Sequence, residues 1–359
     1  MPTVAAARVV IADDSALMRS VLSAALRDAG IEVVGQAADG DEALALCERL
    51  APDVLSLDLA MPGRDGVGVL RELRSRRLQI PVVVVSAFSA AAGARAVDAL
   101  AEGAFDLVAK PTSSGELDAF TRELVDRVQL ARATRRRNAP SRGAGARRAA
   151  SPAALRRRRP VAPPAGDGTA KAGHRVVVIT CSTGGPRALA ELLPRLPSPL
   201  GDGTLIVQHM PEGFTASLAD RLDRASSLKV GEAHDRERLD AAHALLAPGG
   251  QHMRVSAGGV VRLTDEPPVG GLRPRADLTI RDVVKVWGAR TLLVVLTGMG
   301  SDGLDGAVEV HNAGGRVIVE AASSCVVHGM PRAVLDAGLA DGEYDLSALP
   351  EVIVAEVGR

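Results

Sequence analysis

The stretch RVVIADDS (residues 8–15) begins as an apolar, β-branched run and ends in two adjacent carboxylates, Asp13 and Asp14. Four more apolar runs follow within residues 7–131, and a helical pattern comes after each run. Apolar runs without polar alternation are typical of parallel strands that helices cover on both faces. We therefore predict a doubly wound parallel sheet of five βα units. The expected strands cover residues 8–12, 31–37, 53–57, 81–85 and 104–109, and the expected helices cover 15–29, 41–50, 67–74, 90–101 and 114–132.

Polar residues stand at the carboxyl ends of four of these strands, and such ends meet at one rim of a parallel sheet. In chain order they are Asp13, Asp14, Asp58, Ser86 and Lys110. Three carboxylates at one rim repel one another unless a cation lies among them, and Mg²⁺ prefers oxygen ligands of this kind. We predict an Mg²⁺ site at Asp13, Asp14 and Asp58, with a phosphoryl group on Asp58 that Ser86 and Lys110 help to neutralise. Simple solvation would explain any one of these acids, but not the joint pattern.

A second parallel sheet is expected after residue 173, and its first strand ends at a candidate nucleophile. The run HRVVVIT (174–180) is followed by Cys181, Ser182, Thr183, Gly184 and Gly185, and then by a helical pattern over 186–196. A serine between a buried strand and a helix is presented at the sheet rim, and the two glycines allow backbone N–H groups to approach a developing oxyanion. The helix N-terminus also favours negative charge there. The turn matches neither GxSxG nor GxxxxGK[ST], which argues against a common esterase elbow and against a P-loop.

Two later strands of this sheet supply a candidate base and its acidic partner. GTLIVQ (203–208) runs into His209, and TLLVVL (291–296) runs into a Gly-rich turn with Met299 and Asp302. Parallel strands would bring nucleophile Ser182, base His209 and orienting Asp302 to one crevice. Asp302 can also cap the following helix, and Met299 can either donate its N–H to the oxyanion or simply pack. Other candidate bases are His234, His243, His252 and His328. We favour His209 because it closes a parallel strand beside the Ser182 unit.

A basic segment separates the two sheets. Residues 131–173 hold eleven Arg and one Lys against a single acid, Asp167, in a chain of 359 residues with a formal net charge of zero. The segment is rich in Pro, Ala and Gly and lacks apolar periodicity, so burial cannot offset its ordering entropy. We predict domains over 5–132 and 174–357 and a disordered linker over 133–173 that helps to hold the two acidic domains together. No aromatic residue interleaves the Arg runs, which argues against nucleic acid as a partner.

Features that would place the protein in or across a membrane are missing from the sequence. No apolar stretch reaches the roughly 20 residues that a membrane span requires, and the first residues lack a secretory signal pattern. We therefore expect a cytoplasmic protein without direct membrane insertion. Cys47, Cys181 and Cys325 are odd in number, far apart and outside any CxxC pattern, so we expect reduced thiols in the core.

Residues 9–132 resemble the receiver domain of two-component response regulators. The resemblance is carried by the Asp pair after the first strand, an Asp followed by MPGRDG, a Ser that ends the fourth strand and a Lys-Pro after the fifth. It implies that Asp58 is the phosphoacceptor, that Asp13 and Asp14 bind the metal, and that Ser86 and Lys110 contact the phosphoryl group. Leu107 stands where many receivers have an aromatic switch residue.

Residues 175–354 resemble the catalytic domain of the chemotaxis protein-glutamate methylesterase family, through ITCSTGGP (179–186), IVQHMPEGFT (206–215), APGGQHM (247–253), VLTGMGSDG (295–303) and VVHGMPRAV (326–334). This resemblance implies hydrolysis of glutamate γ-methyl esters on methyl-accepting chemotaxis receptors, with deamidation of selected receptor glutamines by the same triad. It also implies a chemotaxis histidine kinase as phosphodonor, Mg²⁺ for the receiver and no cofactor for the hydrolase. In this family the unphosphorylated receiver covers the hydrolase crevice.

The chain departs from the family at several positions. Thr180 and Cys181 replace a Gly-Ala pair, Arg275 replaces a Ser, residues 320–322 replace a Gln-Asp-Glu run, and His328 replaces an aromatic. Two other interpretations stay open from the sequence. One is a non-catalytic response regulator whose second domain binds a receptor or nucleic acid. The other is an enzyme of the same architecture that acts on a different ester or amide.

Overall fold

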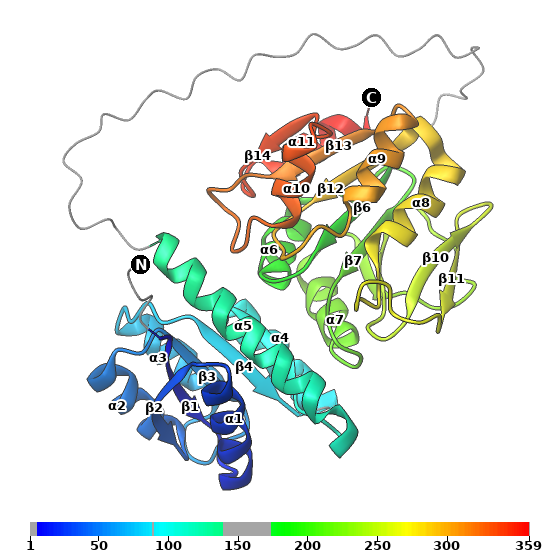
Figure 1. The fold of residues 1–359 in the computed structure, drawn as a ribbon. Coiled ribbons are helices and arrows are strands. Elements are labelled where there is room, and N and C mark those ends of the chain that lie inside the picture. The colour runs from blue at the N-terminus through cyan, green and yellow to red at the C-terminus, as the bar shows by residue number, and fades with distance from the viewer. Residues whose placement is uncertain (1–5, 88–89, 139–173, 359) are drawn as a thin grey trace, which may run out of the picture.

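The first domain is built on a five-stranded sheet whose strands are all parallel, in the order β2-β1-β3-β4-β5 (Figure 1). This computed structural model describes residues 6–87, 90–138 and 174–358. The strands are β1 (Arg8–Ala12), β2 (Glu32–Ala37), β3 (Val54–Asp58), β4 (Val82–Ser86) and β5 (Asp106–Ala109). Strands β3 and β4 are buried along their whole length, as expected for strands that helices cover on both faces. The predicted doubly wound parallel sheet is confirmed.

The helices of this domain divide between the two faces of the sheet. Helices α1 (Ala16–Asp28) and α5 (Leu117–Asn138) cover one face, and α2 (Gly40–Leu50), α3 (Gly66–Ser75) and α4 (Ala90–Ala101) cover the other. The side chains of Ser15, Asp39 and Asp65 accept a first-turn backbone N–H, which fixes where α1, α2 and α3 begin. A 3₁₀ turn, η1 (Ser114–Glu116), precedes α5, and α5 continues past its expected end at residue 132. Most of the predicted linker, residues 139–173, lies outside the described residues.

The second domain is built on a seven-stranded parallel sheet in the order β14-β13-β12-β6-β7-β9-β8. Its strands are β6 (Val176–Cys181), β7 (Thr204–Gln208), β8 (Lys229–Glu232), β9 (His243–Leu246), β12 (Thr291–Val295), β13 (Arg316–Glu320) and β14 (Gly342–Tyr344). Strand β6 lies between β7 and β12. The three strands that carry the predicted triad are therefore neighbours.

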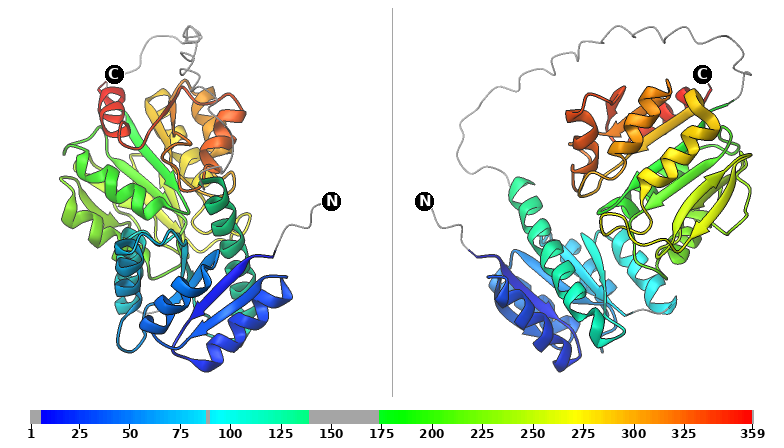
Figure 2. Two further views of the ribbon diagram at one scale, coloured as in Figure 1. Left: turned by 90° about the vertical axis from the view of Figure 1, so that its left-hand side faces the viewer. Right: turned by 45° about the vertical axis from the view of Figure 1, so that its right-hand side comes forward.

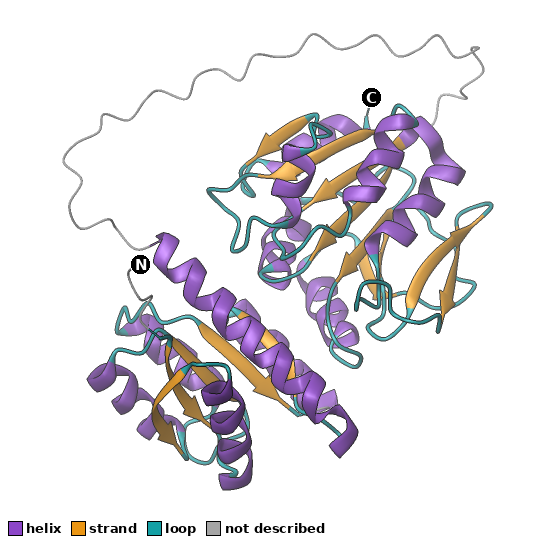
Figure 3. Cartoon of the chain, in the orientation of Figure 1, coloured by secondary structure: helices purple, strands orange, loops and turns teal. Residues whose placement is uncertain are grey.

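Helices cover both faces of this sheet as well. One face packs against α6 (Gly185–Leu192), α7 (Thr215–Ala225) and α11 (Leu349–Val357), and the other against α8 (Ala276–Trp287), α9 (Leu304–Asn312) and α10 (Met330–Asp336). Two 3₁₀ turns, η2 (Leu193–Arg195) and η3 (Gly288–Arg290), follow α6 and α8. An antiparallel hairpin of β10 (His252–Ser256) and β11 (Val260–Thr264) stands apart from the main sheet and packs on α8 (Figure 3). The sequence analysis did not predict this hairpin.

The two domains pack directly on each other, with α4 and the β5–α5 side of the first facing α6 and α7 of the second (Figure 2). Gly93 of α4 lies so close to the loop before α7 that an added Cβ would be 3.0 Å from the carbonyl oxygen of Gly213. Val327 of the second domain is buried in the apolar cluster that α5 contributes to. Arg221 of α7 pairs with Asp98 of α4. The contact surface thus combines apolar packing with charge pairing.

Two expectations about the whole chain can be compared with the structure. None of the helices described is both long and apolar enough to cross a membrane. Cys47, Cys181 and Cys325 are buried and free of disulfides, in agreement with the prediction of thiols in the core. Burial raises the pKa of the Cys47 thiol to about 12, so this thiol is not activated.

Candidate active site

The rim of the first sheet holds an acidic cluster. Carboxylate oxygens of Asp13, Asp14 and Asp58 all lie within 4.8 Å of one another. Lys110 Nζ donates to Asp58 Oδ2 at 2.7 Å and lies 2.8 Å from Asp13 Oδ2. Burial alone would lower the pKa of the Lys110 ammonium, but its bonds to the two carboxylates hold that pKa above its usual value. Carboxylate oxygens at this spacing suit a hard divalent cation such as Mg²⁺.

Ser86 reaches the same rim through strand pairing. It ends β4 and is buried, and its carbonyl oxygen accepts the Lys110 N–H at 2.8 Å. Leu107, in β5 just before Lys110, is buried in the sheet. The sheet therefore brings all the residues predicted for phosphorylation to one edge.

In the second domain, Ser182 sits on a tight turn between β6 and α6. Its N–H donates to the Thr297 carbonyl at 3.0 Å, and its carbonyl accepts the Gly185 N–H at 2.7 Å. Gly184 has φ +82°, and an added Cβ would lie 2.6 Å from Val326 Cβ. The turn therefore requires glycine at position 184 both for its backbone conformation and for space.

Backbone N–H groups beside Ser182 are available to a ligand. Within the described residues, no acceptor faces the N–H groups of Thr183, Gly184 or Met299. The Met299 residue is 47% exposed, so it does not pack in the core. Unpaired N–H groups next to a helix N-terminus are suited to stabilise an oxyanion.

His209 and Asp302 lie together at this rim. His209 Nε2 is 2.7 Å from Asp302 Oδ2, and both side chains are almost fully buried. Gln208, which the sequence analysis did not single out, donates from Nε2 to the carbonyl oxygens of Ser182 at 3.1 Å and of His209 at 2.8 Å. No hydrogen bond joins the Ser182 hydroxyl to the His209 ring in the part of the chain that is described, and such looseness is common before substrate binds.

Asp302 and Asp277 link the starts of α8 and α9 by reciprocal hydrogen bonds. Asp302 accepts the N–H groups of Ala276 at 2.7 Å and Asp277 at 3.0 Å, at the start of α8. Asp277 in turn accepts the N–H groups of Gly303 at 2.8 Å and Gly306 at 2.9 Å, at the start of α9. We predicted that Asp302 can also cap α9. Asp302 Oδ1 does accept the Gly303 N–H at 3.0 Å, but Asp277 shares that N–H and also accepts the Gly306 N–H in the first turn. Asp277 was missed because only the fold makes the two carboxylates neighbours.

Burial alone would raise the pKa of the Asp302 carboxyl, but the hydrogen bonds from His209 and from the start of α8 hold it well below its usual range. Asp302 therefore stays ionised beside the imidazole. An ionised partner on Nε2 favours the tautomer that leaves Nδ1 as the acceptor.

The four other candidate bases have different partners. His234 is near Glu237, and His243 Nδ1 pairs with Asp240 at 2.6 Å. The buried His252 contacts the carbonyl oxygen of Pro267 and accepts the Arg275 N–H, and His328 lies beside Gly298. Of these histidines, His209 is the one that the structure places against the carboxylate at the end of β12.

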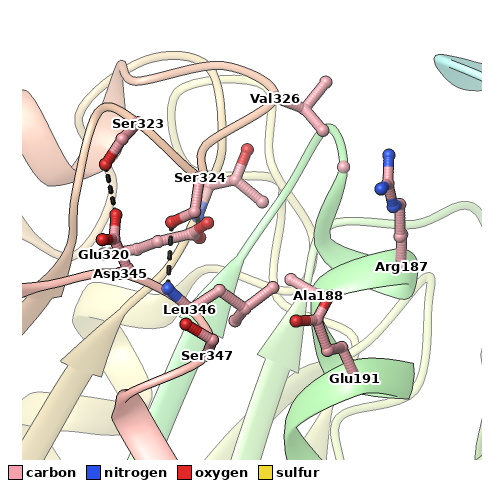
Figure 4. A pocket seen from close by; sticks show the side chains of 12 residues that line it. Arg187, Ala188, Glu191, Glu320, Ser323, Ser324, Val326, Asp345, Leu346 and Ser347 are labelled. Carbon is pink, nitrogen blue, oxygen red and sulfur yellow. Dashed lines mark hydrogen bonds between the residues drawn. The ribbon is translucent and has the colours of Figure 1, made fainter.

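A cavity of about 470 Å³ adjoins the nucleophile turn (Figure 4). Gly184 and Thr297 belong to its wall, but the predicted triad does not. Glu320, at one of the positions where the chain departs from the family, is fully buried here and accepts the Thr297 N–H at 2.8 Å. This buried carboxylate fixes the strand end from which the Asp302 turn begins.

The first domain reaches the nucleophile turn directly. Thr183 donates from its hydroxyl to Asp106 Oδ2 at 2.5 Å, and Arg127 Nη1 donates to the same hydroxyl at 3.1 Å. Arg127 also pairs with Asp106 at 3.2 Å. Asp106 begins β5 and Arg127 lies on α5, so we call these three residues the Thr183 latch. Ser182 itself is only 5% exposed, so the nucleophile is covered in this arrangement of the two domains.

The fold and the site define a response regulator whose second domain is a hydrolase built on a parallel sheet. A family model for the response regulator receiver domain matches residues 9–122, and one for CheB methylesterase matches residues 177–353. The chain is 44% identical to the protein-glutamate methylesterase/protein-glutamine glutaminase of Symbiobacterium thermophilum over 363 residues, which cover 98% of this chain and 97% of that protein. Proteins of the same description from Koribacter versatilis and Caulobacter vibrioides are each 40% identical, over 97% of this chain and 96% and 97% of theirs.

The chain therefore belongs to the CheB methylesterase family. This membership favours the hydrolase over the non-catalytic binding module that the sequence left open.

Proposed function

We propose that this protein hydrolyses the γ-methyl esters of glutamate side chains on methyl-accepting chemotaxis receptors, and that it deamidates selected receptor glutamines at the same site. The observation that carries the proposal is the 2.7 Å contact of His209 with an ionised Asp302 at the rim that also holds Ser182. The printed names of the relatives support the choice of substrate.

In the proposed mechanism Ser182 Oγ attacks the ester carbonyl while His209 takes its proton on Nδ1. The Thr183, Gly184 and Met299 N–H groups stabilise the oxyanion. The C–OCH₃ bond then breaks, and His209 gives its proton to the departing methoxide, which leaves as methanol. Water attacks the acyl-enzyme with His209 again as base, so that glutamate is released and Ser182 is restored. With glutamine the leaving group is ammonia.

The first domain regulates this reaction through phosphorylation of Asp58, with a chemotaxis histidine kinase as phosphodonor. Mg²⁺ held by Asp13, Asp14 and Asp58 would supply positive charge to the phosphoryl oxygens. Lys110 bonds to Asp58 at one end of β5, and Asp106 bonds to Thr183 at the other. A phosphoryl group on Asp58 gives Lys110 a new partner. The resulting shift of β5 weakens the Thr183 latch and favours an open state in which the first domain no longer covers Ser182.

The test is methanol release from receptor-containing membranes that carry radiolabelled methyl groups. We expect release by the wild type, its loss in Ser182→Ala, and stimulation by a small phosphodonor that Asp58→Asn abolishes. Ser256→Ala, which removes a hydroxyl from the remote hairpin, is the control. Labelling of Ser182 by a fluorophosphonate probe without methanol release would instead favour an enzyme for a different ester or amide. No labelling and no release would overturn the proposal.

A further inference from the structure

We propose that Arg275 is a positioning residue that sets the charge balance around Asp302 and so the pH at which His209 can act as a base. The inference rests on the proposed esterase function. It concerns a position where the chain departs from the family pattern, so the family does not supply it.

Arg275 bonds to both carboxylates behind the imidazole. Its Nε lies 2.8 Å from Asp302 Oδ1, and its Nη2 donates to Asp277 Oδ2 at 2.6 Å. The guanidinium side chain is 18% exposed, whereas the two carboxylates are 1% and 6% exposed. The backbone N–H of Arg275 donates to His252 Nδ1 at 3.2 Å. A buried fork of this kind fixes both the position and the charge of Asp302.

The position of Arg275 in the fold argues for a role in charge rather than in helix capping. It is the N-cap residue of α8, yet its side chain caps nothing there. The Asp302 carboxylate bonds to the first N–H groups of α8 instead. A serine at position 275 would be a good N-cap, so the arginine gives up that interaction in exchange for contacts with the acids.

The charged groups around Arg275 and the Asp302–His209 pair come from three elements. They are Arg275 and Asp277 at the start of α8, Asp305 in the first turn of α9, and His252 of β10 behind Arg275. Burial and the neighbouring Asp302 raise the pKa of the Asp277 carboxyl. Without Arg275, two carboxylates would share one cation, the His209 imidazolium. The charged imidazolium would therefore be favoured, and His209 would act as a base only at higher pH.

Four variants of the full-length protein separate charge from shape. Arg275→Ser and Arg275→Gln remove the charge, and Arg275→Gln keeps two donors. Arg275→Lys keeps the charge. Arg254→Ser is the matched control, because Arg254 forms the same kind of pair with Asp282 of α8, at 2.6 Å, outside the site. One readout is the His209 titration by NMR, assigned with His209→Gln. The other is the pH profile of fluorophosphonate labelling with a small phosphodonor present.

We expect Arg275→Ser and Arg275→Gln to move the His209 titration and the acid limb of the labelling profile to higher pH, with about tenfold slower labelling on that limb. Arg275→Lys and Arg254→Ser should titrate like the wild type. A wild-type titration in Arg275→Gln, or a loss of labelling that is equal at every pH, would overturn the inference. If the wild type shows no esterase activity but His209 still shifts in the Arg275 variants, the proposed function fails and the charge role stands.

Discussion

Asp302 bonds through both oxygens to the His209 ring and to the start of α8. Its ionised state is thus set by a helix end as well as by the imidazole. The same residue that orients the base also joins two secondary-structure elements. Substitutions at position 302 should therefore affect rate and stability together.

Asp302→Asn should lower kcat by about 10³–10⁴-fold, because an amide no longer enforces the His209 tautomer. An N–H of the new side-chain amide would also point at the backbone N–H groups of α8 that the carboxylate accepts. The free energy of unfolding should therefore fall by about 1–3 kcal/mol. Methanol release and urea unfolding measure the two effects. Asp265→Asn, which changes an exposed acid that accepts from Gln251, is the control. Near-normal kcat in Asp302→Asn would remove Asp302 from the mechanism.

Gly184→Ala should inactivate the enzyme and destabilise it more than an ordinary glycine substitution. A positive φ alone costs an alanine about 1–2 kcal/mol, and the contact with Val326 adds about 1–3 kcal/mol of overpacking. Gly338→Ala is a matched control, because Gly338 has φ +70° and open space around its Cβ position. Thermal unfolding of both variants isolates the contribution of the contact. Equal losses in the two variants would show that the Val326 contact is unimportant.

At the scale of elements, β5 connects the two sites. The strand has four residues, from Asp106 in the Thr183 latch to Ala109, and Lys110 follows it directly. The buried Leu107 fills the place of an aromatic switch residue, so we attribute transmission to the strand and its polar ends rather than to a rotating ring.

Arg127→Ala should raise the activity of the unphosphorylated protein severalfold. Burial alone would lower the pKa of the Arg127 guanidinium, but Asp106 and Glu123 hold it above its usual value. Removal of this cation leaves Asp106 and Glu123 facing each other at the latch, which weakens the contact and favours the open state. Arg122→Ala changes an exposed residue of the same helix and should leave basal activity unchanged. Basal methanol release that is the same in both variants would exclude the latch as an inhibitory contact.

Much of the architecture followed from the sequence, because buried parallel strands have a clear apolar signal. Strand ends then placed Ser182, His209 and Asp302 near one another. The antiparallel hairpin was missed because its partly exposed strands lack the unbroken apolar run of the buried parallel strands. Asp277 and Gln208 were missed because their contacts join segments far apart in the chain. The end of α5 was misplaced because Arg135, beyond the predicted end, donates to the Pro52 carbonyl oxygen, a tertiary contact that the sequence pattern does not reveal.

On the scale of the whole molecule, the two domains contact each other through apolar packing and through the Arg127–Asp106 and Arg221–Asp98 pairs. Basal activity should rise between about 0.1 M and 1 M salt, because the screening length falls from about 10 Å to about 3 Å. The double variant Arg127→Ala, Arg221→Ala should respond less. Methanol release by unphosphorylated protein measures both. An equal response of the two proteins would assign the salt effect to charges elsewhere, including the basic segment 139–173.

The exchange of helix caps between Asp277 and Asp302 has a practical consequence for the capture of receptor complexes. An inactive form for that purpose should be made at Ser182, where the lost hydroxyl bonds to no other element of the described chain. A form made at Asp302 would lose the bonds to the start of α8 and to Gly303 before α9, so weaker receptor binding by that form would report the loosened helices rather than the native protein.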